Sequence, residues 1–317
     1  MPSTSLSAVL IPTLLLAIQD PSESKSQGPD SGPAPIEAET LALFDYDRDA
    51  PLAIEEAGVE TYPGYTVADI SYASPAGGRV PAFLYQPNGE GPYAGIVVMH
   101  GMPGDRNGAR VFADRYVGTG AVVVAISAPW ARPDGPRDEI VSFTRKDRDE
   151  QIQLIQDLRR AVDLLESFPW VDKERIGYVG GSYGGAMGGL LAGVEHRIKA
   201  YALAVGDGGL VAHFTGPDDG AGFPEGLDAE QWQAWRALMD PIEPIRFVAH
   251  AAPSHLLFQN GKTDQLVPAA DARVYQAAGS EPKKIIWYDH GHAMSQQLLK
   301  DQVEWLAERI GIDATKF

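Results

Sequence analysis

The chain has 317 residues, carries 26 lysines and arginines against 43 aspartates and glutamates for a formal net charge of −17, and contains no cysteine. A strongly acidic surface repels phosphate backbones and anionic lipid headgroups, so nucleic acid and membrane surfaces are excluded as expected partners. Without a thiol, the chain also lacks disulfides, cysteine-ligated metal sites and a cysteine nucleophile. The 34 glycines and 24 prolines indicate a globular chain with many turns.

The first 38 residues differ in composition from the rest. Residues 8–18 form an apolar run of eleven, which is too short to span a bilayer and has the length of a signal-peptide core. No lysine or arginine precedes Lys25 and no A-x-A cleavage site follows the run, so an apolar tail is the alternative. We expect a signal peptide over residues 1–19, a flexible linker over 20–38, and a secreted or periplasmic protein, with the cytoplasm as the alternative location.

Residues 39–317 alternate strand and helix patterns. Two β-type runs, 67–73 and 80–86, flank a turn-like segment and predict an antiparallel hairpin. The clearest helical pattern is 151–167, where apolar residues recur on one face. Short runs that are apolar on both faces predict buried parallel strands, and these runs cover residues 96–99, 122–126, 176–179, 200–205, 256–258 and 285–287.

This order of elements predicts a single α/β domain over residues 39–317. Its central sheet is mostly parallel, starts with an antiparallel hairpin and carries helices on both faces. A chain of this length can form two domains, but α/β folds of about 250 residues commonly form one. In such sheets the loops at the carboxyl ends of the strands hold the chemistry, so functional residues are expected directly after the predicted strands.

Residues 180–184, Gly-Gly-Ser-Tyr-Gly, match the pattern G-x-S-x-G. In a nucleophile elbow the serine lies on a strained strand-to-helix turn, and the flanking glycines avoid collisions with the neighbouring backbone. The pattern alone is weak in a glycine-rich chain, where an ordinary turn is the alternative. The predicted strand before it and the helix-compatible stretch after it favour Ser182 as a nucleophile.

A serine nucleophile needs a base that accepts its proton and a carboxylate that orients the base. In this fold the acid and the histidine follow the serine in the chain and lie after later strands. Asp264 follows the predicted strand 256–258, and His292 follows the predicted strand 285–287. We therefore expect Asp264 and His292 to complete the set.

Each of these two assignments has a rival in the sequence. His290 lies two places before His292, but Gly291 allows a tight turn just ahead of His292, which we favour. Asp289 and Asp207 are rival acids, and Asp207 is the one to test because it also follows a predicted strand.

The loop after the strand 96–99 is the candidate for stabilising negative charge on a carbonyl oxygen. Two backbone N–H groups are needed for that task, and one comes from Tyr183, next to the serine. Pro103 cannot donate, which leaves Gly101 or Met102 for the second, and we favour Met102. His100 is interpreted as a structural residue that holds this loop.

Together these segments resemble the α/β-hydrolase superfamily and, within it, the dienelactone-hydrolase and prolyl-oligopeptidase-like branch. The resemblance covers about residues 60–312. It implies Ser182 as nucleophile, His292 as general base and then acid, Asp264 as the residue that orients it, and the Met102 and Tyr183 amides as an oxyanion hole. The segments that carry it are 180–184, the His100-Gly101 pair, the Asp264 loop ending in Leu266-Val267-Pro268, the Gly291-His292 pair, and residues 170–177 before the elbow strand.

The chain differs from both dienelactone hydrolases and prolyl oligopeptidases. Serine stands where dienelactone hydrolases use cysteine, and the length leaves no room for the propeller of prolyl oligopeptidases. We expect a serine esterase that cleaves a small carboxylic ester through an acyl-enzyme, with no cofactor or metal. The alternatives are a peptidase or acyltransferase on the same residues, or a receptor that binds a ligand without catalysis. The sequence does not indicate an oligomeric state.

Weaker signals remain. Asp45, Asp47, Asp49 and Glu56 have calcium-loop spacing, but Ala50 replaces the glycine that the loop requires, so an acidic surface turn is expected.

Two tryptophans are candidate substrate-binding residues. Trp232 lies at helical spacing with Trp235 inside residues 208–252, which form either a small cap over the site or a helix packed on the core. Trp130 follows the predicted strand 122–126 and either lines the substrate pocket or covers the edge of the sheet.

Overall fold

The computed structural model describes residues 32–133, 140–216, 224 and 226–317. The predicted signal peptide, residues 1–19, and most of the predicted linker lie outside these residues. Pro35–Phe317 form one compact unit, which contains the predicted domain. Its first helix, α1 (Ala38–Ala42), is followed at once by Phe44, whose ring is fully buried against Phe247 at 5.5 Å between centroids.

In the described part of the chain, a single sheet of nine strands runs in the order β1-β2-β3-β5-β4-β6-β7-β8-β9. The strands β1, β2, β3 and β5 pair antiparallel in that order, and every later pair is parallel. The predicted mostly parallel sheet is therefore confirmed. The bounds are β1 (Glu55–Tyr62), β2 (Tyr65–Ala73), β3 (Arg79–Pro87), β4 (Tyr93–Met99), β5 (Ala121–Ile126), β6 (Val171–Gly181), β7 (Ala200–Ala204), β8 (His255–Gly261) and β9 (Lys283–Tyr288).

The N-terminal hairpin is confirmed, and one further strand extends it. β2 and β3 pair from Tyr65 with Pro87 to Ala73 with Arg79, as the two β-type runs predict. The sequence analysis missed β1, in which every residue except Tyr62 is exposed. A strand without a buried face has no alternating apolar pattern by which it could be recognised.

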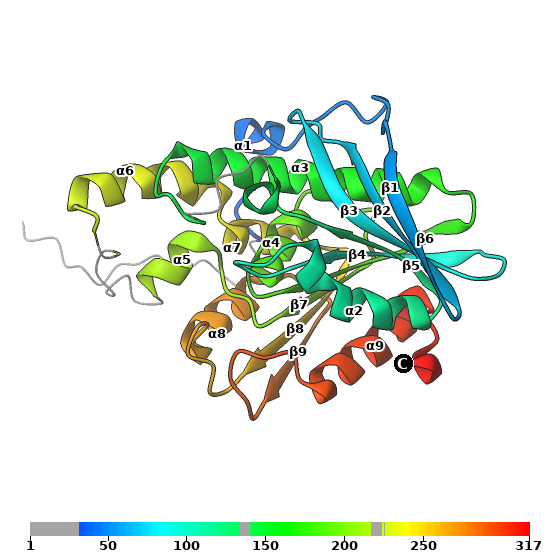
Figure 1. Cartoon of the computed structure of the whole chain (residues 1–317). Helices are drawn as coiled ribbons and strands as arrows, with labels where there is room; N and C mark the ends of the chain where they lie inside the picture. Colours follow the sequence, from blue (N-terminus) through cyan, green and yellow to red (C-terminus); the bar gives the residue numbers. More distant parts are fainter. Residues whose placement is uncertain (1–31, 134–139, 217–223, 225) are drawn as a thin grey trace, which may run out of the picture. The chain divides into compact units, whose positions relative to one another are not determined.

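Helices cover both faces of the sheet (Figure 1). Helices α3 and α4 pack on one face together with α7 and α8, while α2 and α9 pack on the other. Among the described residues no helix combines the length and apolar character needed to cross a bilayer. The bounds are α2 (Arg106–Gly118), α3 (Arg145–Ser167), α4 (Tyr183–Ala192), α5 (Leu210–Thr215), α6 (Ala229–Met239), α7 (Pro244–Phe247), α8 (Ala269–Ala278) and α9 (Gln296–Ile310), with short 3₁₀ turns η1 (Pro129–Ala131), η2 (Asp240–Ile242), η3 (Val248–His250) and η4 (Ala314–Lys316).

Helix α3 confirms the predicted helix over 151–167 and begins six residues earlier. Its charged first turns carry no apolar pattern, and a capping box sets the start instead. The Thr144 side chain accepts a hydrogen bond from the Lys146 N–H, and the Asp147 carboxylate accepts one from the Thr144 N–H. Such a reciprocal cap pairs N–H groups that would otherwise lack partners at the helix start.

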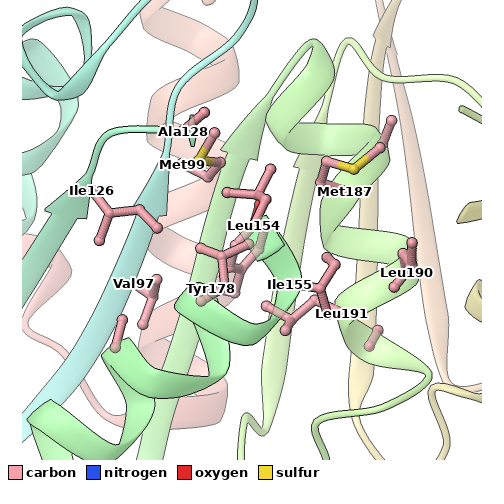
Figure 2. Packing of buried hydrophobic residues seen from close by; sticks show 14 of the residues in the cluster. Val97, Met99, Ile126, Ala128, Leu154, Ile155, Tyr178, Met187, Leu190 and Leu191 are labelled. Atoms are coloured by element: carbon pink, nitrogen blue, oxygen red, sulfur yellow. The ribbon is translucent and has the colours of Figure 1, made fainter. Parts of the chain in front are cut away.

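Apolar side chains from α3 and α4 fill the space above the central strands. Figure 2 shows Leu154 and Ile155 of α3 and Leu190 of α4 among side chains of β4, β5 and β6. All six residues of β5 are buried, as expected of a strand covered by helices on both faces. This packing fixes the carboxyl ends of the parallel strands, from which the candidate functional residues extend.

Candidate active site

Ser182 lies in the sharp turn between β6 and α4. Its backbone adopts φ 55° and ψ −121°, a conformation that is strained for a residue with a side chain. A Cβ atom on Gly180 would lie 2.2 Å from the Gly184 carbonyl oxygen, and one on Gly184 would lie 2.5 Å from the Met99 carbonyl oxygen. The prediction that both glycines prevent backbone collisions is therefore confirmed, and the turn is the strand-to-helix elbow that the pattern indicates.

The structure brings the side chains of Ser182, His292 and Asp264 together from three separate loops. The His292 Nε2 atom lies 2.9 Å from the Ser182 Oγ atom, and His292 Nδ1 lies 2.8 Å from Asp264 Oδ2. The other carboxylate oxygen of Asp264 accepts hydrogen bonds of 2.9 Å from the N–H groups of Leu266 and Val267. The buried Asp264 carboxylate thus has both oxygens occupied, which fixes the orientation of the His292 ring.

The rival residues have other partners. His290 stacks on the Tyr288 ring at 5.3 Å, and its Nδ1 atom lies 2.8 Å from the Gly291 carbonyl oxygen. Asp289 is exposed and pairs with Lys262 at 2.7 Å, and this ammonium group lowers the pKa of the Asp289 carboxyl. Asp207 pairs with His213 instead of His292.

The loop after β4 packs directly against the serine. A Cβ atom on Gly101 would lie 3.0 Å from the Ser182 Cβ atom and 3.1 Å from the Gly181 carbonyl oxygen, so a side chain there would crowd the serine. Met102 in this loop and Tyr183 both line the cavity beside Ser182. Tyr183 is the first residue of α4, where a backbone N–H has no partner within the helix.

His100 holds the same loop, as its structural interpretation predicts. Its Nε2 atom accepts a 3.1 Å hydrogen bond from the Ala128 N–H, and its Nδ1 atom lies 2.8 Å from the Gly101 carbonyl oxygen. Burial lowers the pKa of the His100 imidazole. A neutral ring that donates from Nδ1 and accepts at Nε2 satisfies both contacts at once.

A cavity of about 160 Å³ opens beside Ser182. Leu266 stands at its rim with 62% of its surface exposed. The wall is mostly apolar, and its polar residues other than Tyr183 are Ser182, His292, Asp207 and His213. The lining residues are Met102, Ser182, Tyr183, Ala186, Asp207, Gly209, Leu210, His213, Leu266, Val267 and His292.

Neither candidate tryptophan lines this cavity. Trp232 is buried on α6, where its ring stacks on Trp235 at 5.3 Å between centroids. The Trp235 indole in turn donates a 2.8 Å hydrogen bond to Asp147 of α3, so α6 is held on the neighbouring helix. Trp130 is buried with its ring against Tyr183 at 4.8 Å, and it lines a separate cavity of about 270 Å³ together with Pro103 and Gly104 of the loop after β4. Trp232 therefore packs between helices, whereas Trp130 borders a cavity other than the one that opens at Ser182.

His213 also lines this cavity, although no motif in the sequence indicates it. Asp207, a rival to Asp264 in the sequence, pairs with a different histidine. The sequence contains no motif that predicts this pair. The side chains of Asp207 and His213 meet because the chain turns between them and then starts α5.

Within the described ranges no group of three or more histidines, aspartates and glutamates is placed to hold a metal ion. In the acidic segment near residue 45, the Asp47 carboxylate accepts a hydrogen bond from the Asp49 N–H at 3.0 Å, which is an ordinary turn contact.

The nine-stranded sheet, the elbow and the loops at the carboxyl ends of its strands form the α/β-hydrolase fold. Residues 143–312, just over half of the chain, match the model of the prolyl oligopeptidase family, and the chain belongs to that family.

The similar proteins include both peptidases and esterases by name. The chain is 26% identical over 243 residues to the uncharacterized peptidase YuxL of Bacillus subtilis, covering 72% of this chain and 36% of that protein. It is 23% identical over 279 residues to the esterase FrsA of Salmonella paratyphi B, covering 81% and 62%. The chain therefore spans less than two thirds of the length of these two relatives.

Among solved structures, acetyl xylan esterase 1 from a Thermoanaerobacterium species superposes with a TM-score of 0.69 at 18% identity. The match covers 88% of this chain and 95% of that one. Similarity at this level of identity concerns the fold.

Proposed function

We propose that this protein is a serine hydrolase that cleaves carboxylic esters, with Ser182, His292 and Asp264 as its catalytic residues. The observation that supports the proposal most directly is the pair of contacts of 2.9 Å and 2.8 Å that links the serine hydroxyl to the imidazole and the imidazole to the buried carboxylate. Nucleophile, base and orienting acid within hydrogen-bond reach are the arrangement that activates a serine.

In the proposed reaction the Ser182 oxygen attacks the ester carbonyl carbon while His292 Nε2 takes the hydroxyl proton. The oxygen of the tetrahedral intermediate receives hydrogen bonds from the Met102 and Tyr183 N–H groups. His292 then gives its proton to the leaving alcohol, which produces an acyl-enzyme on Ser182. Water follows the same route in reverse, and Asp264 stabilises the imidazolium in both halves of the reaction.

The size of the cavity favours a small substrate group next to the serine. Its volume of about 160 Å³ lies below the ~300–1,000 Å³ of pockets that hold drug-sized ligands. The apolar part of its wall, from Ala186, Leu210 and Val267, fits a short acyl or alkoxy group. Esters with short chains are therefore the first substrates to try.

A peptidase is the second candidate, because the matching family model and the relative YuxL carry that description. The same residues can attack an amide, and the leaving group then needs a proton from His292 before the C–N bond breaks. Turnover of matched ester and amide substrates separates the two activities. Product analysis in the presence of added alcohols tests for acyl transfer.

The direct test of the proposed function is covalent labelling. A fluorophosphonate probe is incubated with the full chain, and the modified peptide is identified by mass spectrometry. We expect the label on Ser182 together with hydrolysis of p-nitrophenyl acetate. If the protein neither reacts with the probe nor hydrolyses short-chain esters, the result would favour a non-catalytic receptor over an esterase.

Export remains part of the proposal. The apolar run over residues 8–18 supports a signal peptide, and N-terminal sequencing of the protein produced from the full gene tests it. An intact N-terminus on cytoplasmic protein would overturn it.

A further inference from the structure

A second histidine–aspartate pair faces the same cavity as Ser182. His213 Nδ1 lies 2.8 Å from Asp207 Oδ2, and both residues are part of the cavity wall. The proposed ester cleavage uses neither of them. Asp207 is buried, whereas 39% of the His213 side chain is exposed, so the aspartate is held inside and the ring extends into accessible space.

The turn that carries Asp207 is held from several sides. Val205, directly after β7, has φ 44°, a conformation that costs energy for a β-branched residue, and its N–H donates a 2.7 Å hydrogen bond to Gln259. The Gly206 carbonyl accepts a hydrogen bond from the Asn260 side chain at 3.1 Å. A Cβ atom on Gly206 would lie 2.8 Å from the backbone of Gly185 in α4. These contacts hold the strained backbone of Val205 in place, and strained residues held in this way are common at functional sites.

The helix that carries His213 is fixed as well. The Oε2 atom of the buried Glu243 side chain accepts a 3.2 Å hydrogen bond from the N–H of Ala212, the residue before His213. Gly209, at the start of α5, has φ 125°, and a Cβ atom there would lie 2.5 Å from Glu243 Oε2. The ring of His213 also meets Phe214 edge to face at 5.4 Å. Both partners of the pair are therefore placed by the fold.

Since Nδ1 is occupied by Asp207, the Nε2 atom is the ring's remaining polar group, and it has no partner among the described residues. The hydrogen bond to Asp207 raises the pKa of the His213 imidazole, and the charges of Asp207, Asp271 and Asp264 add to this while burial opposes it. The imidazolium presents an Nε2–H donor, whereas the neutral ring that donates to Asp207 does not.

We propose that His213, held by Asp207, is a specificity-determining residue whose Nε2–H donates a hydrogen bond to an uncharged oxygen substituent of the substrate. The inference rests on the proposed function and narrows its substrate class. The preferred esters carry a hydroxyl, ether or carbonyl oxygen near the ester bond, in either the acyl or the alcohol part. A substrate carboxylate is disfavoured because Asp207, Asp264 and Asp271 place negative charge around the ring.

The test compares two esters that differ only in one CH₂ group replaced by oxygen. p-Nitrophenyl methoxyacetate and p-nitrophenyl butanoate probe the acyl part, and 2-methoxyethyl acetate and butyl acetate probe the alcohol part. The measured quantity is the ratio of kcat/KM for the oxygen ester to that for the alkyl ester. Dividing this ratio by the same ratio for a variant cancels the intrinsic reactivities of the two esters.

We expect His213→Leu to lower the ratio by about 10- to 100-fold in one of the two series, the range for a hydrogen bond to a charged group. His213→Gln restores part of it, because an amide N–H can also donate. His196, which is exposed just before the amino end of β7, provides the matched control His196→Leu, with an unchanged ratio. Circular dichroism confirms that each variant is folded.

The pH dependence gives a readout that a purely structural role would not move. The ratio is highest where His213 is an imidazolium and falls as the pH rises through its pKa, while any effect of pH on the shared catalytic step acts on both esters and cancels. Asp207→Asn removes the largest cause of the raised pKa of His213 and shifts this fall to lower pH. Glu243 and the carboxylates of Asp264 and Asp271 are unchanged in this variant.

The outcomes separate the two proposals. Ratios that are equal in the wild type and in His213→Leu, in both series, would overturn the inference and leave the esterase intact. An enzyme that turns over none of the four esters would refute the proposed function and the inference with it.

Discussion

Two histidines line the cavity beside Ser182, and each pairs with an aspartate through a 2.8 Å contact between Nδ1 and a carboxylate oxygen. Asp264 accepts two further backbone hydrogen bonds of 2.9 Å, whereas Asp207 accepts one, from Gly209 at 3.3 Å. The decisive difference is on the far side of each ring. His292 Nε2 reaches the serine hydroxyl at 2.9 Å, whereas His213 Nε2 bonds to no hydroxyl group among the residues that the structure describes.

The comparison shows that a histidine and an aspartate at hydrogen-bond distance do not define a reaction by themselves. The neighbouring group decides whether the imidazole accepts a proton from a nucleophile or offers one to a ligand. In this molecule one pair is proposed to carry the chemistry and the other to select the substrate. The following changes test that division of labour.

The largest effect is expected from Ser182→Ala, which removes the nucleophile and leaves both pairs in place. We expect kcat for p-nitrophenyl acetate to fall by on the order of 10⁴-fold or more, because without the hydroxyl no acyl-enzyme forms. Steady-state kinetics measures the loss, and fluorophosphonate labelling disappears with it. Activity within tenfold of the wild type would rule out Ser182 as the nucleophile.

The next effect separates the two acids. Asp264→Asn replaces the carboxylate that orients His292, and we expect kcat to fall by on the order of 10⁴-fold. Asp207→Asn is the matched control, since it makes the same chemical change on the other pair, and its effect on kcat for an alkyl ester is expected to stay below about tenfold. The opposite ranking of the two variants would exchange the roles of Asp264 and Asp207.

The strained elbow is tested by Gly180→Ala. The added Cβ atom would lie 2.2 Å from the Gly184 carbonyl oxygen, so the turn must shift. We expect the free energy of unfolding to fall by about 1–3 kcal/mol, with a loss of activity because Ser182 moves relative to His292. Urea denaturation and ester turnover measure the two effects.

A matched control is available in Gly108→Ala. This exposed glycine in α2 has no atom within 4 Å of an added Cβ. The variant is expected to change stability by less than about 1 kcal/mol and to retain activity. Equal destabilisation by both changes would contradict the argument from backbone crowding at the elbow.

The positions of Ser182, Asp264 and His292 could be predicted from the sequence because each residue belongs to a short motif next to a recognisable strand. The glycines around Ser182 encode a turn that only they permit, and Asp264 and His292 follow strands recognisable as apolar runs. The position of both residues at one edge of a parallel sheet then follows from topology.

The remaining features depend on packing that no local pattern records. Whether Trp232 lines a substrate pocket or packs on Trp235 is decided by where α6 lies relative to α3. Likewise, His213 joins the cavity because of a strained turn at Val205 and a buried carboxylate on another segment. Tertiary placement of this kind is visible only in the structure.

The remaining change concerns stability alone and is made at Glu243, the buried carboxyl group behind the second pair. Burial raises its pKa from an ordinary value of 4.5 to about 8. Between these values the folded protein keeps the proton that the unfolded chain releases, so stability falls as the pH rises from about 4.5 to 8, by up to about 1.4 kcal/mol per pH unit for this one group. Glu243→Gln keeps an oxygen for the Ala212 N–H and cannot ionise.

We therefore expect Glu243→Gln to exceed the wild type in Tm at pH 8.5 and to approach it at pH 5, as measured by thermal denaturation across this range. The difference between the two proteins isolates Glu243 from every other titrating group. If the curves stay parallel at all pH values, the carboxyl group is not protonated in the folded protein. The second pair would then stand beside a buried negative charge, which would strengthen the imidazolium form of His213 and extend its selectivity to higher pH.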